Sequence, residues 1–439
     1  MKNYKVLASL MIMFWIASSI SAQNPIIRDQ FTADPTARVF NGKVYLFPSH
    51  DIPTPPDKGL RENWFCMEDY HVFSSENLTD WTDHGVIVTQ TEVPWLTRIG
   101  YDMWAPDCVE RNGKYYFYFP VGGRIGVAIA EKPEGPYKVQ EKPVEGIRGI
   151  DPCVLIDKDG QAYIYTSMGR IMVAKLKENM VEIEGEVQTI ANLPTQGLIE
   201  GPFAFEKDGK YYLTYPHVEN VTERLEYAMG DSPMGPFKQV GVIMDESPSG
   251  CWTNHHSLVK YKGQWYLFYH DQDYSPKFDK NRSAKIDSLF FNADGTIQKV
   301  IPTHRGVGIT EATAEIQIDR YSALSDNGAS VDYKDSTNTF DGWKTILSDK
   351  GAWIRYNTVG FDKKMKKVQV KAASKNGGAI EIRLDKADGP VVAEVDIPKS
   401  SNWKTVDAKV SKIDAGNHDL LVVSKDSNPV EIDWVQFSK

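Results

Sequence analysis

A short sequence unit returns five times in the first three hundred residues and constrains the fold more than any other feature of the chain. Each copy is a glycine-centred turn followed by a run of aromatic and branched residues. Asn-Gly and Asp-Gly supply the positive φ of a tight hairpin turn, and the residues after them favour a pleated strand. The copies occupy residues 41–48, 112–120, 159–166, 208–216 and 262–270.

The spacing of these turns indicates an architecture. The turn glycines, which are Gly42, Gly113, Gly160, Gly209 and Gly263, are separated by 71, 47, 49 and 54 residues. Periods near fifty residues, with several short strands in each, are typical of propeller blades. We therefore predict an all-β chain that starts with a five-bladed β-propeller, its blades lying between about residue 27 and residue 305. A sandwich built of hairpins is the alternative, but it would not require such regular spacing.

An ionisable residue stands shortly before the turn in every repeat. These residues are Asp34, Asp107, Asp151, Glu200 and the pair His255 and His256. In a propeller the innermost strands converge on the central channel, so the groups would share one small funnel. Like charges confined in one pocket push their pKa values apart, which lets one site hold both an acid and a base.

Four ordered motifs around these residues resemble glycoside hydrolase family 43, whose members are five-bladed propeller enzymes acting on arabinose- and xylose-containing plant polysaccharides. The motifs are Thr32-Ala-Asp-Pro35, Met103-Trp-Ala-Pro-Asp107, Gly149-Ile-Asp-Pro152 and Ile199-Glu-Gly-Pro-Phe203. The resemblance implies that Asp34 is the general base, Glu200 the general acid, and Asp151 the neighbour that raises the pKa of the acid. Inverting hydrolysis needs one protonated and one ionised carboxyl group, so these residue types suit the chemistry.

Three further residues are candidates for substrate contact. Trp104 would stack on a sugar or line a subsite, with core packing between blades as the alternative. Asn254-His-His-Ser257 resembles the last-blade histidine segment of the family, so His255 would face the channel, where some members hold a calcium ion through water. By the same resemblance Arg282 would contact the sugar in the cleavage subsite. No cofactor is required for the chemistry itself.

The resemblance implies an inverting exo-glycosidase of plant cell-wall polysaccharides. We expect an α-L-arabinofuranosidase acting on arabinoxylan or arabinan. A β-xylosidase, or an endo-acting xylanase or arabinanase, is the alternative, because all of these would use the same three carboxylates and differ in pocket shape and in loops such as Pro53 to Met67. From another class, a non-catalytic glycan-binding propeller would need aromatic residues but not three acids together.

A second domain, residues 311–439, is expected after a catalytic domain of residues 23–310. Segments such as 352–356, 367–371 and 379–384 alternate with the two-residue period of a half-buried sheet, which predicts a β-sandwich (jelly-roll) domain. Residues 316–321, Trp403 and residues 431–434 resemble a family 6 carbohydrate-binding module, which implies a structural calcium at Gln317, Asp319 and Asp433. Glu431 and Leu347 stand where that family has a sugar-contacting asparagine and an aromatic ring. Glycan binding and a purely structural appendage therefore both stay open.

Charge and the N-terminal segment limit the partners and the location. Lys and Arg number 50 and Asp and Glu 59, and the net charge of −9 argues against nucleic acid as a partner. Residues 1–22 combine two lysines, an apolar run and small residues before Gln23, which is the pattern of a signal peptide. The run is too short for a spanning helix. We expect a periplasmic or secreted monomer that acts on a polysaccharide or oligosaccharide.

Overall fold

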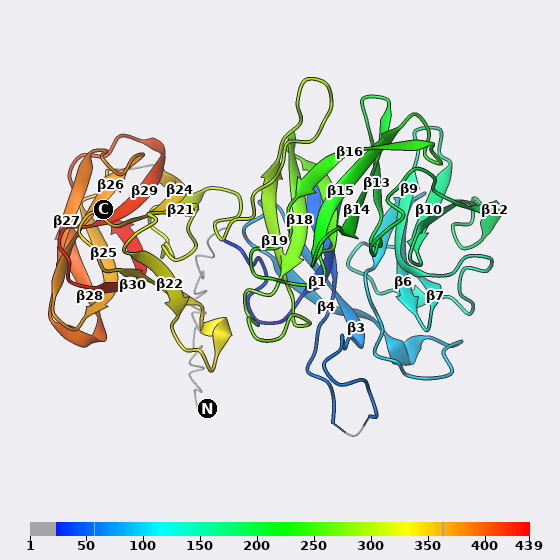
Figure 1. The fold of residues 1–439 in the computed structure, drawn as a ribbon, viewed down its shortest axis with the longest axis horizontal. Helices are drawn as coiled ribbons and strands as arrows, with labels where there is room; N and C mark the ends of the chain where they lie inside the picture. The colour runs from blue at the N-terminus through cyan, green and yellow to red at the C-terminus, as the bar shows by residue number, and fades with distance from the viewer. Residues whose placement is uncertain (1–22, 57, 362–363) are drawn as a thin grey trace, which may run out of the picture.

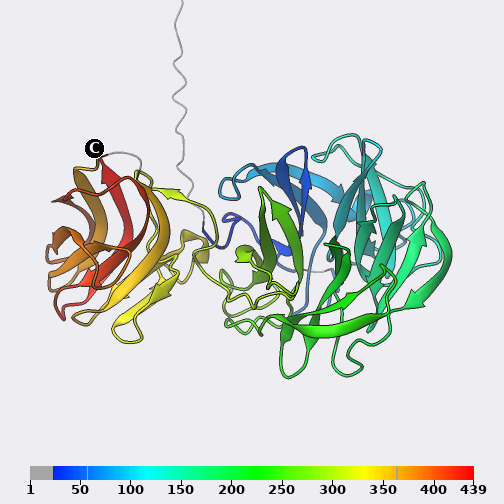
Figure 2. The same ribbon diagram turned by 90° about the horizontal axis from the view of Figure 1, so that it is seen from above.

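The computed structural model describes residues 23–439 except 57 and 362–363, and the predicted signal peptide, residues 1–22, lies outside the described residues. The described residues form two lobes, with residues 33–289 (blue to green) in one and the C-terminal strands (yellow to red) in the other (Figures 1 and 2). They contain no α-helix, only the short 3₁₀ helices η1 (Gln90–Glu92) and η2 (Thr339–Asp341). The predicted all-β class is confirmed. No helix in this part of the chain is long and apolar enough to cross a bilayer.

Five antiparallel sheets follow one another along the first lobe, each with its strands in chain order. The first contains β1 (Ala33–Phe40), β2 (Lys43–Ser49), β3 (Asp69–Ser75) and β4 (Thr82–Thr89). The second contains β5 (Asp107–Arg111), β6 (Lys114–Val121), β7 (Arg124–Ala130) and β8 (Lys138–Val139). The third contains β9 (Ile150–Ile156), β10 (Ala162–Ser167), β11 (Ile171–Leu176) and β12 (Ile183–Thr189). The fourth contains β13 (Phe203–Lys207), β14 (Lys210–Val218), β15 (Glu223–Gly230) and β16 (Phe237–Met244), and the fifth β17 (His256–Tyr261), β18 (Gln264–Asp271) and β19 (Ser283–Leu289).

The five predicted hairpins are the first two strands of these sheets. In the first sheet Phe40 pairs with Lys43, which leaves a two-residue loop. In that loop Asn41 and Gly42 adopt φ of +50° and +78°, the left-handed values that such a loop requires. The turn chemistry in the sequence therefore fixes the start of every sheet.

The first strands of the five sheets contact one another in a closed series. β1 contacts β5 and β17, β9 contacts β5 and β13, and β13 contacts β17. Apolar clusters fill the space between neighbouring sheets, with Phe47 packing on Phe117 between the first and second sheets. The N-terminal segment runs beside β19 in the three-stranded fifth sheet, where the Ile26 amide donates to the Ala284 carbonyl at 2.9 Å. The start and the end of the lobe are thereby joined.

Two facing sheets form the second lobe. One contains β20 (Thr310–Glu311), β24 (Trp353–Phe361), β29 (Gly416–Ser424), β26 (Gly378–Leu384) and β27 (Val391–Ile397), with β21 (Ala323–Leu324) also paired to β24. The other contains β22 (Ala329–Tyr333), β23 (Trp343–Leu347), β30 (Val430–Ser438), β25 (Lys367–Ser374) and β28 (Ser400–Lys409). Their buried faces share one apolar core that includes Ile354, Val422, Val370 and Val435. This arrangement fits the predicted β-sandwich.

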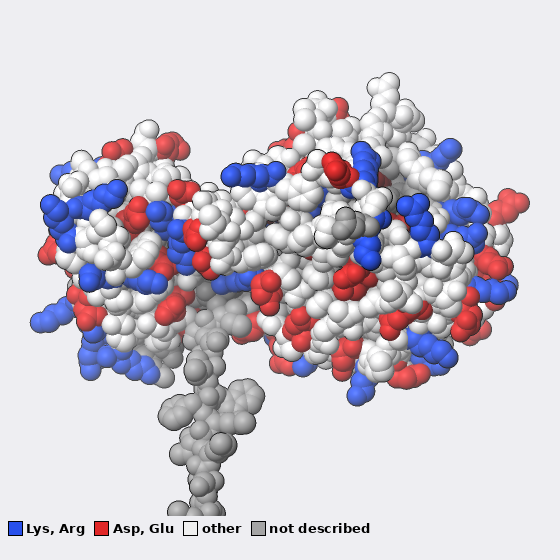
Figure 3. Space-filling view, turned by 90° about the horizontal axis from the view of Figure 1, so that it is seen from below, with Lys and Arg blue, Asp and Glu red and all other residues white. Residues whose placement is uncertain are grey.

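Aromatic and polar contacts join the two lobes. Tyr274, in the loop between β18 and β19, stacks on Trp343 with ring centroids 5.1 Å apart. The Arg320 guanidinium lies 4.1 Å from the Trp343 ring and donates to the Tyr274 hydroxyl at 3.0 Å. On the face seen in Figure 3, acidic and basic side chains are interspersed over both lobes.

Candidate active site

The predicted catalytic residues stand at equivalent ends of different sheets. Asp34 lies at the start of β1 and Asp151 at the start of β9, while Glu200 precedes β13 and His255 precedes β17. Because the first strands contact one another around the lobe, these ends meet. All four residues line one small cavity of about 110 Å³. Its wall also includes Trp64, Phe65, Met67, Trp104, Ile150, Glu223, Trp252, Thr253, Asn254 and Arg282.

An unusual backbone conformation presents two of the acids to this cavity. Asp34 and Asp151 have φ of +49° and +53°, left-handed values that non-glycine residues rarely adopt. Glu200, the third acid, is followed by Gly201 at φ +52°. An added Cβ at Gly201 would lie 2.8 Å from His255 Nδ1 and from the Pro216 ring. Such strained positions persist where the surrounding structure enforces them, and they cluster at active sites.

Positive charge surrounds the buried carboxylate of Asp34. Arg282 donates to its two oxygens at 2.9 and 3.4 Å, and the Ser49 hydroxyl donates at 2.5 Å. Burial alone would raise the pKa of Asp34, but the charge of Arg282, assisted by the Ser49 hydrogen bond, outweighs it and lowers that pKa to about 2. Asp34 is therefore ionised at any pH near neutrality, as a general base must be.

His270 fixes the backbone of the same residue. The Asp34 amide donates to His270 Nδ1 at 3.0 Å, so the ring proton is on Nε2, which lies 3.1 Å from the Thr253 carbonyl. Burial lowers the pKa of His270 to about 3, which keeps the ring neutral. A neutral ring can accept this bond, whereas an imidazolium could not.

Asp151 and Glu200 form a pair of the opposite kind. Burial raises the pKa of Glu200 to about 7 and that of Asp151 to about 7, and the neighbouring Glu200 charge adds to the effect on Asp151. The Gly201 amide and the Ser167 hydroxyl donate to Asp151 at 3.0 and 2.9 Å. This pair holds a proton close to neutral pH, as a general acid must.

Glu223, at the start of β15, is a fourth acid in the cavity and was not predicted. Burial, and then the charge of Glu200, raises the pKa of Glu223 well above its usual range, so its carboxyl group is neutral. It shares a side-chain hydrogen bond with Glu200 that lowers the pKa of Glu200, as expected when Glu223 donates. Glu223 Oε2 accepts a hydrogen bond from the backbone N–H of Asn254 at 2.6 Å.

The three predicted substrate-contacting residues all line the cavity, but in different states. Arg282 is buried and also donates from Nε and Nη2 to Asp51 at 3.0 and 2.9 Å, so its guanidinium is shared between two carboxylates. His255 faces the cavity, whereas His256 is fully buried and bonded to Thr214 at 2.6 Å. Trp104 lines the cavity and also packs against an apolar cluster between sheets. Direct contact of Trp104, Arg282 and His255 with a sugar stays a prediction.

Buried polar atoms at the cavity wall lack partners among the described residues. They are Trp104 Nε1 and Asn254 Oδ1 and Nδ2. Buried polar groups are normally hydrogen-bonded, so atoms of this kind suit a hydroxyl-rich ligand. A second cavity of about 620 Å³ shares Trp64 and Phe65 with the first, and its lining includes Trp95 and Asp102, which also carry buried unpartnered atoms.

The predicted calcium ligands of the second lobe differ in their surroundings. Asp319 is buried and its carboxylate oxygens accept no hydrogen bond from the described residues, but Oδ2 forms an ion pair with Arg320 Nε at 3.4 Å. Asp433, however, already pairs with Lys334 at 3.1 Å and Lys371 at 2.8 Å. Two ammonium groups on one ligand would repel a divalent cation, so the set that includes Gln317 does not fit calcium in this arrangement.

Several partners of the catalytic acids were missed because they are distant in the chain. Asp51 and Glu223 belong to no recurring motif, and His270 ends the fifth copy of the repeat where no other copy has a histidine. The burial and pairing of all three depend on the tertiary fold. The only available signal was the repeat itself, since Ser49 and Ser167 end equivalent strands and bond equivalent acids.

Comparison with known proteins identifies the lobe that carries these acids. The family model for glycosyl hydrolases family 43 matches residues 22–297, more than half of the chain. The chain belongs to glycoside hydrolase family 43. Enzymes of family 43 hydrolyse glycosidic bonds with inversion at the anomeric carbon. The model for carbohydrate binding module family 6 matches residues 323–439.

Individual relatives cover either the family 43 lobe or both lobes. The chain is 36% identical over 326 residues to "Xylosidase/arabinosidase 43A" of Humicola insolens, a match that covers 62% of this chain and 98% of the relative. It is 28% identical to "Arabinoxylan arabinofuranohydrolase" of Bacillus subtilis, over 97% of this chain and 94% of the relative. The crystal structure of CoXyl43, a family 43 β-xylosidase/α-arabinofuranosidase from a compost microbial metagenome in complex with xylotriose, in calcium-free form, has a TM-score of 0.58 at 35% identity, covering 64% of this chain and 98% of that one.

Proposed function

We propose that this family 43 enzyme is an exo-acting glycosidase that removes single pentose units, primarily α-L-arabinofuranosyl residues, from arabinoxylan or arabinan. The observation that carries the proposal is one small cavity that holds an ionised Asp34 opposite the protonated pair of Asp151 and Glu200. A cavity of about 110 Å³ beside one of about 620 Å³ suits a terminal sugar at the acids and the remaining chain beyond Trp64 and Phe65.

The proposed reaction is a single displacement. Asp34 takes a proton from a water molecule while the oxygen of that water attacks the anomeric carbon. Glu200 gives its proton to the departing glycosidic oxygen. The products are a pentose of inverted configuration and a free hydroxyl on the remaining glycan. Burial and the charge of Asp34 raise the pKa of Glu200, and Asp151 titrates together with Glu200, so the pair keeps a proton near neutral pH. Arg282 keeps Asp34 ionised and in position.

The domain arrangement and the location belong to the same proposal. The closed series of first strands supports assigning the five sheets as the blades of a propeller spanning residues 23–310, with the sandwich at residues 311–439. The N-terminal pattern of residues 1–22 supports export to the periplasm or the medium, and we propose a monomer.

The nature of the pentose rests on the relatives. The Bacillus subtilis arabinofuranohydrolase matches both lobes, which favours arabinofuranosyl side chains on a xylan backbone. A β-xylosidase is the second candidate, because the Humicola insolens relative is more similar in sequence and its name includes xylosidase.

Aryl α-L-arabinofuranoside, aryl β-D-xyloside and arabinoxylan test this function together. We expect the wild type to hydrolyse the arabinofuranoside faster, to release only single arabinose units from arabinoxylan, and to give the inverted anomer by NMR at the earliest times. Faster xyloside hydrolysis would replace the first candidate by the second, and release of oligosaccharides would exclude exo action. If a folded wild type and Glu200→Gln were equally inactive on every substrate, a glycan-binding propeller would be the better assignment.

We also propose that the second lobe binds the polysaccharide through Trp403. Its match to a carbohydrate-binding module supports this role, although Leu347 is buried and Glu431 is paired with Lys344 at 3.1 Å. Affinity electrophoresis of the full chain on xylan and arabinan should show retardation that Trp403→Ala abolishes. Equal mobility of both proteins with and without glycan would instead indicate a structural appendage.

A further inference from the structure

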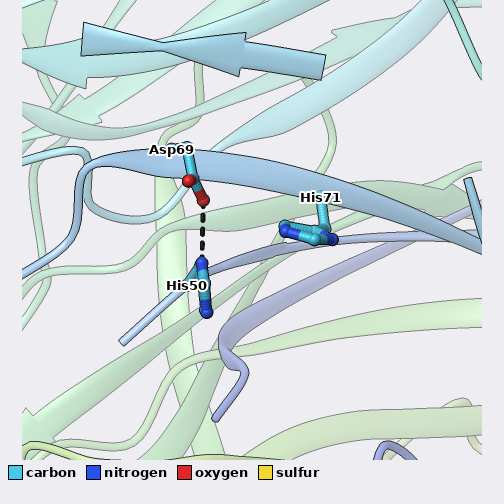
Figure 4. Close-up of side chains that lie close together, drawn as sticks. All are labelled: His50, Asp69 and His71. Carbon is cyan, nitrogen blue, oxygen red and sulfur yellow. Dashed lines mark hydrogen bonds and ion pairs between the residues drawn. The ribbon is translucent and has the colours of Figure 1, made fainter. Parts of the chain in front are cut away.

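A second group of ligand-type side chains lies on the first sheet, outside the catalytic cavity. His50, Asp69 and His71 each offer one ligand atom, and these atoms lie within 4.8 Å of one another. Figure 4 shows Asp69 and His71 projecting from β3 toward His50, which follows β2. None of the three lines the cavity that holds the four acids, and the proposed reaction does not use them.

The strand register explains why these side chains meet. Ser49 pairs with Tyr70 across the antiparallel strands β2 and β3, so the next residue, His50, stands opposite Asp69. Asp69 and His71 are two residues apart on β3 and therefore point to the same face. The pleat thus gathers two imidazoles and one carboxylate on one side of the sheet.

Neighbouring groups orient the cluster as in a metal site. His71 Nδ1 lies 3.1 Å from both carboxylate oxygens of Asp83 on β4, which leaves Nε2 available as a ligand atom. Metal-binding histidines usually bond a carboxylate through their second nitrogen in this way. His50 Nδ1 lies 2.8 Å from Asp69 Oδ1. The side chains of His50, Asp69 and His71 are 22%, 13% and 15% exposed, so an ion could reach them from solvent.

We propose that His50, Asp69 and His71 bind a divalent transition-metal ion of the zinc class, with Asp83 orienting His71. Imidazole and carboxylate together suit zinc and its neighbours, whereas calcium would need six to eight oxygen ligands. Ligand atoms at about 2.0–2.2 Å from zinc lie at most about 4.4 Å from each other. A small inward movement of the three side chains is therefore enough to complete the site.

The position of the cluster gives the ion a structural role. His50 and Asp69 flank the loop between β2 and β3, which carries Trp64 and Phe65 to the wall of the catalytic cavity. Asp51, next to His50, pairs with Arg282 beside the general base. A metal bound at the base of this loop would hold both of its ends and so fix the wall against which the sugar packs.

Equilibrium dialysis of the untagged full chain tests the site directly. After treatment with a chelator, the protein is dialysed against Zn²⁺ and the bound metal is counted. We expect one equivalent in the wild type and none in His71→Asn or in His50→Gln. Asp83→Asn should weaken binding by about 10–100-fold, because it removes only the group that orients His71.

Two further variants act as matched controls. His418 also bonds a carboxylate, Asp385 at 3.1 Å, but it lies outside any such cluster among the described residues. His418→Gln should therefore still bind one equivalent of Zn²⁺. His255→Gln should also keep it, since loss there would place the ion in the catalytic cavity and overturn the proposal. The proposal also fails if the wild type binds no more zinc than His71→Asn.

Cobalt gives a measurement that does not depend on the folding of any variant. Co²⁺ added to the wild type should develop visible absorption bands of a histidine-ligated ion, and stoichiometric Zn²⁺ should abolish them. A spectrum that stays identical to aqueous Co²⁺ would contradict the site.

Discussion

Asp34 and Asp151 occupy equivalent places in two sheets and share almost every local feature. Each precedes a proline at the start of a first strand, with φ of +49° and +53°. Each accepts a hydrogen bond from a serine that ends the second strand of its own sheet, Ser49 or Ser167. The repeat therefore supplies the same backbone and the same first partner to both acids.

The two carboxyl groups nevertheless differ widely in proton affinity. Asp34 faces Arg282 and has a pKa lowered to about 2, whereas burial and the neighbouring Glu200 raise that of Asp151 to about 7. The difference comes from the group that faces each acid, which is Arg282 for Asp34 and Glu200 for Asp151. A duplicated structural unit can thus place equivalent acids, while their chemical roles are set by what the rest of the chain brings beside them.

Removing the carboxylate of Asp34 should have the largest effect. Asp34→Asn keeps the size of the side chain but cannot accept a proton from water, so we expect kcat to fall by about 10²–10⁴-fold on every substrate. Asp231→Asn, which alters an exposed carboxylate paired with Lys210, should leave kcat unchanged. Comparable activity in Asp34→Asn and Asp231→Asn would remove Asp34 from the role of base.

Glu200→Gln should have an effect that depends on the leaving group. A glycoside whose leaving group is a weak base departs without a proton, so loss of the general acid should matter little for a dinitrophenyl glycoside. For a poor leaving group such as a natural glycan, kcat should fall by about 10²–10⁴-fold. Steady-state rates across a series of aryl glycosides measure this dependence, and an equal loss on all of them would contradict the assignment.

Asp34→Asn and Asp151→Asn should change stability in opposite directions at pH 8. The raised pKa of Asp151 means that folding becomes less favourable as pH rises from about 4, its unfolded value, to about 7, and the loss is complete above that. Asparagine removes this loss, so the melting temperature should rise at pH 8 and match the wild type at pH 4. Each pKa unit corresponds to about 1.4 kcal/mol, so the gain is on the order of 4 kcal/mol.

For Asp34 the sign is reversed. Its pKa is lowered, so its contribution to stability is present above about pH 4 and is lost as pH falls toward about 2. Asp34→Asn should therefore lower the melting temperature at pH 8. Thermal unfolding across pH 4–8 measures the melting temperature of both variants relative to the wild type. Shifts of the same sign in the two variants at pH 8 would show that the environments of Asp34 and Asp151 do not differ as described.

The features of the fold and site that repeat could be predicted from the sequence. Those that depend on single contacts between residues far apart in the chain could not. The hairpin turns and their spacing predicted the five sheet starts, and the first interval of 71 residues is long because the loop between β2 and β3 is inserted there. The same periodicity placed Asp34, Asp151 and Glu200 at equivalent ends. Arg282 was predicted to touch sugar, but its pairing with Asp51 joins residues 231 positions apart and has no local pattern. Likewise, nothing near Asp433 in the sequence indicates that Lys334 and Lys371 will meet it.

Glu223 gives the smallest expected effect, because it changes only the raised pKa of Glu200 and not the lowered pKa of Asp34. Its neutral carboxyl group donates to Glu200 and lowers the pKa of Glu200. Because that pKa is about 7, we expect the alkaline limit of kcat/KM near pH 7, and Glu223→Ala should move it to higher pH by up to about one unit. The amide of Glu223→Gln can still donate, so its profile should stay close to that of the wild type. The measurement is kcat/KM against pH on an aryl glycoside with a poor leaving group, where protonation of Glu200 is required. A larger shift in Glu223→Gln than in Glu223→Ala would contradict this assignment. It would mean that Glu223 is charged and raises the pKa of Glu200 by repulsion. Both variants would then remove the charge, and the glutamine would lower the pKa further by donating a hydrogen bond.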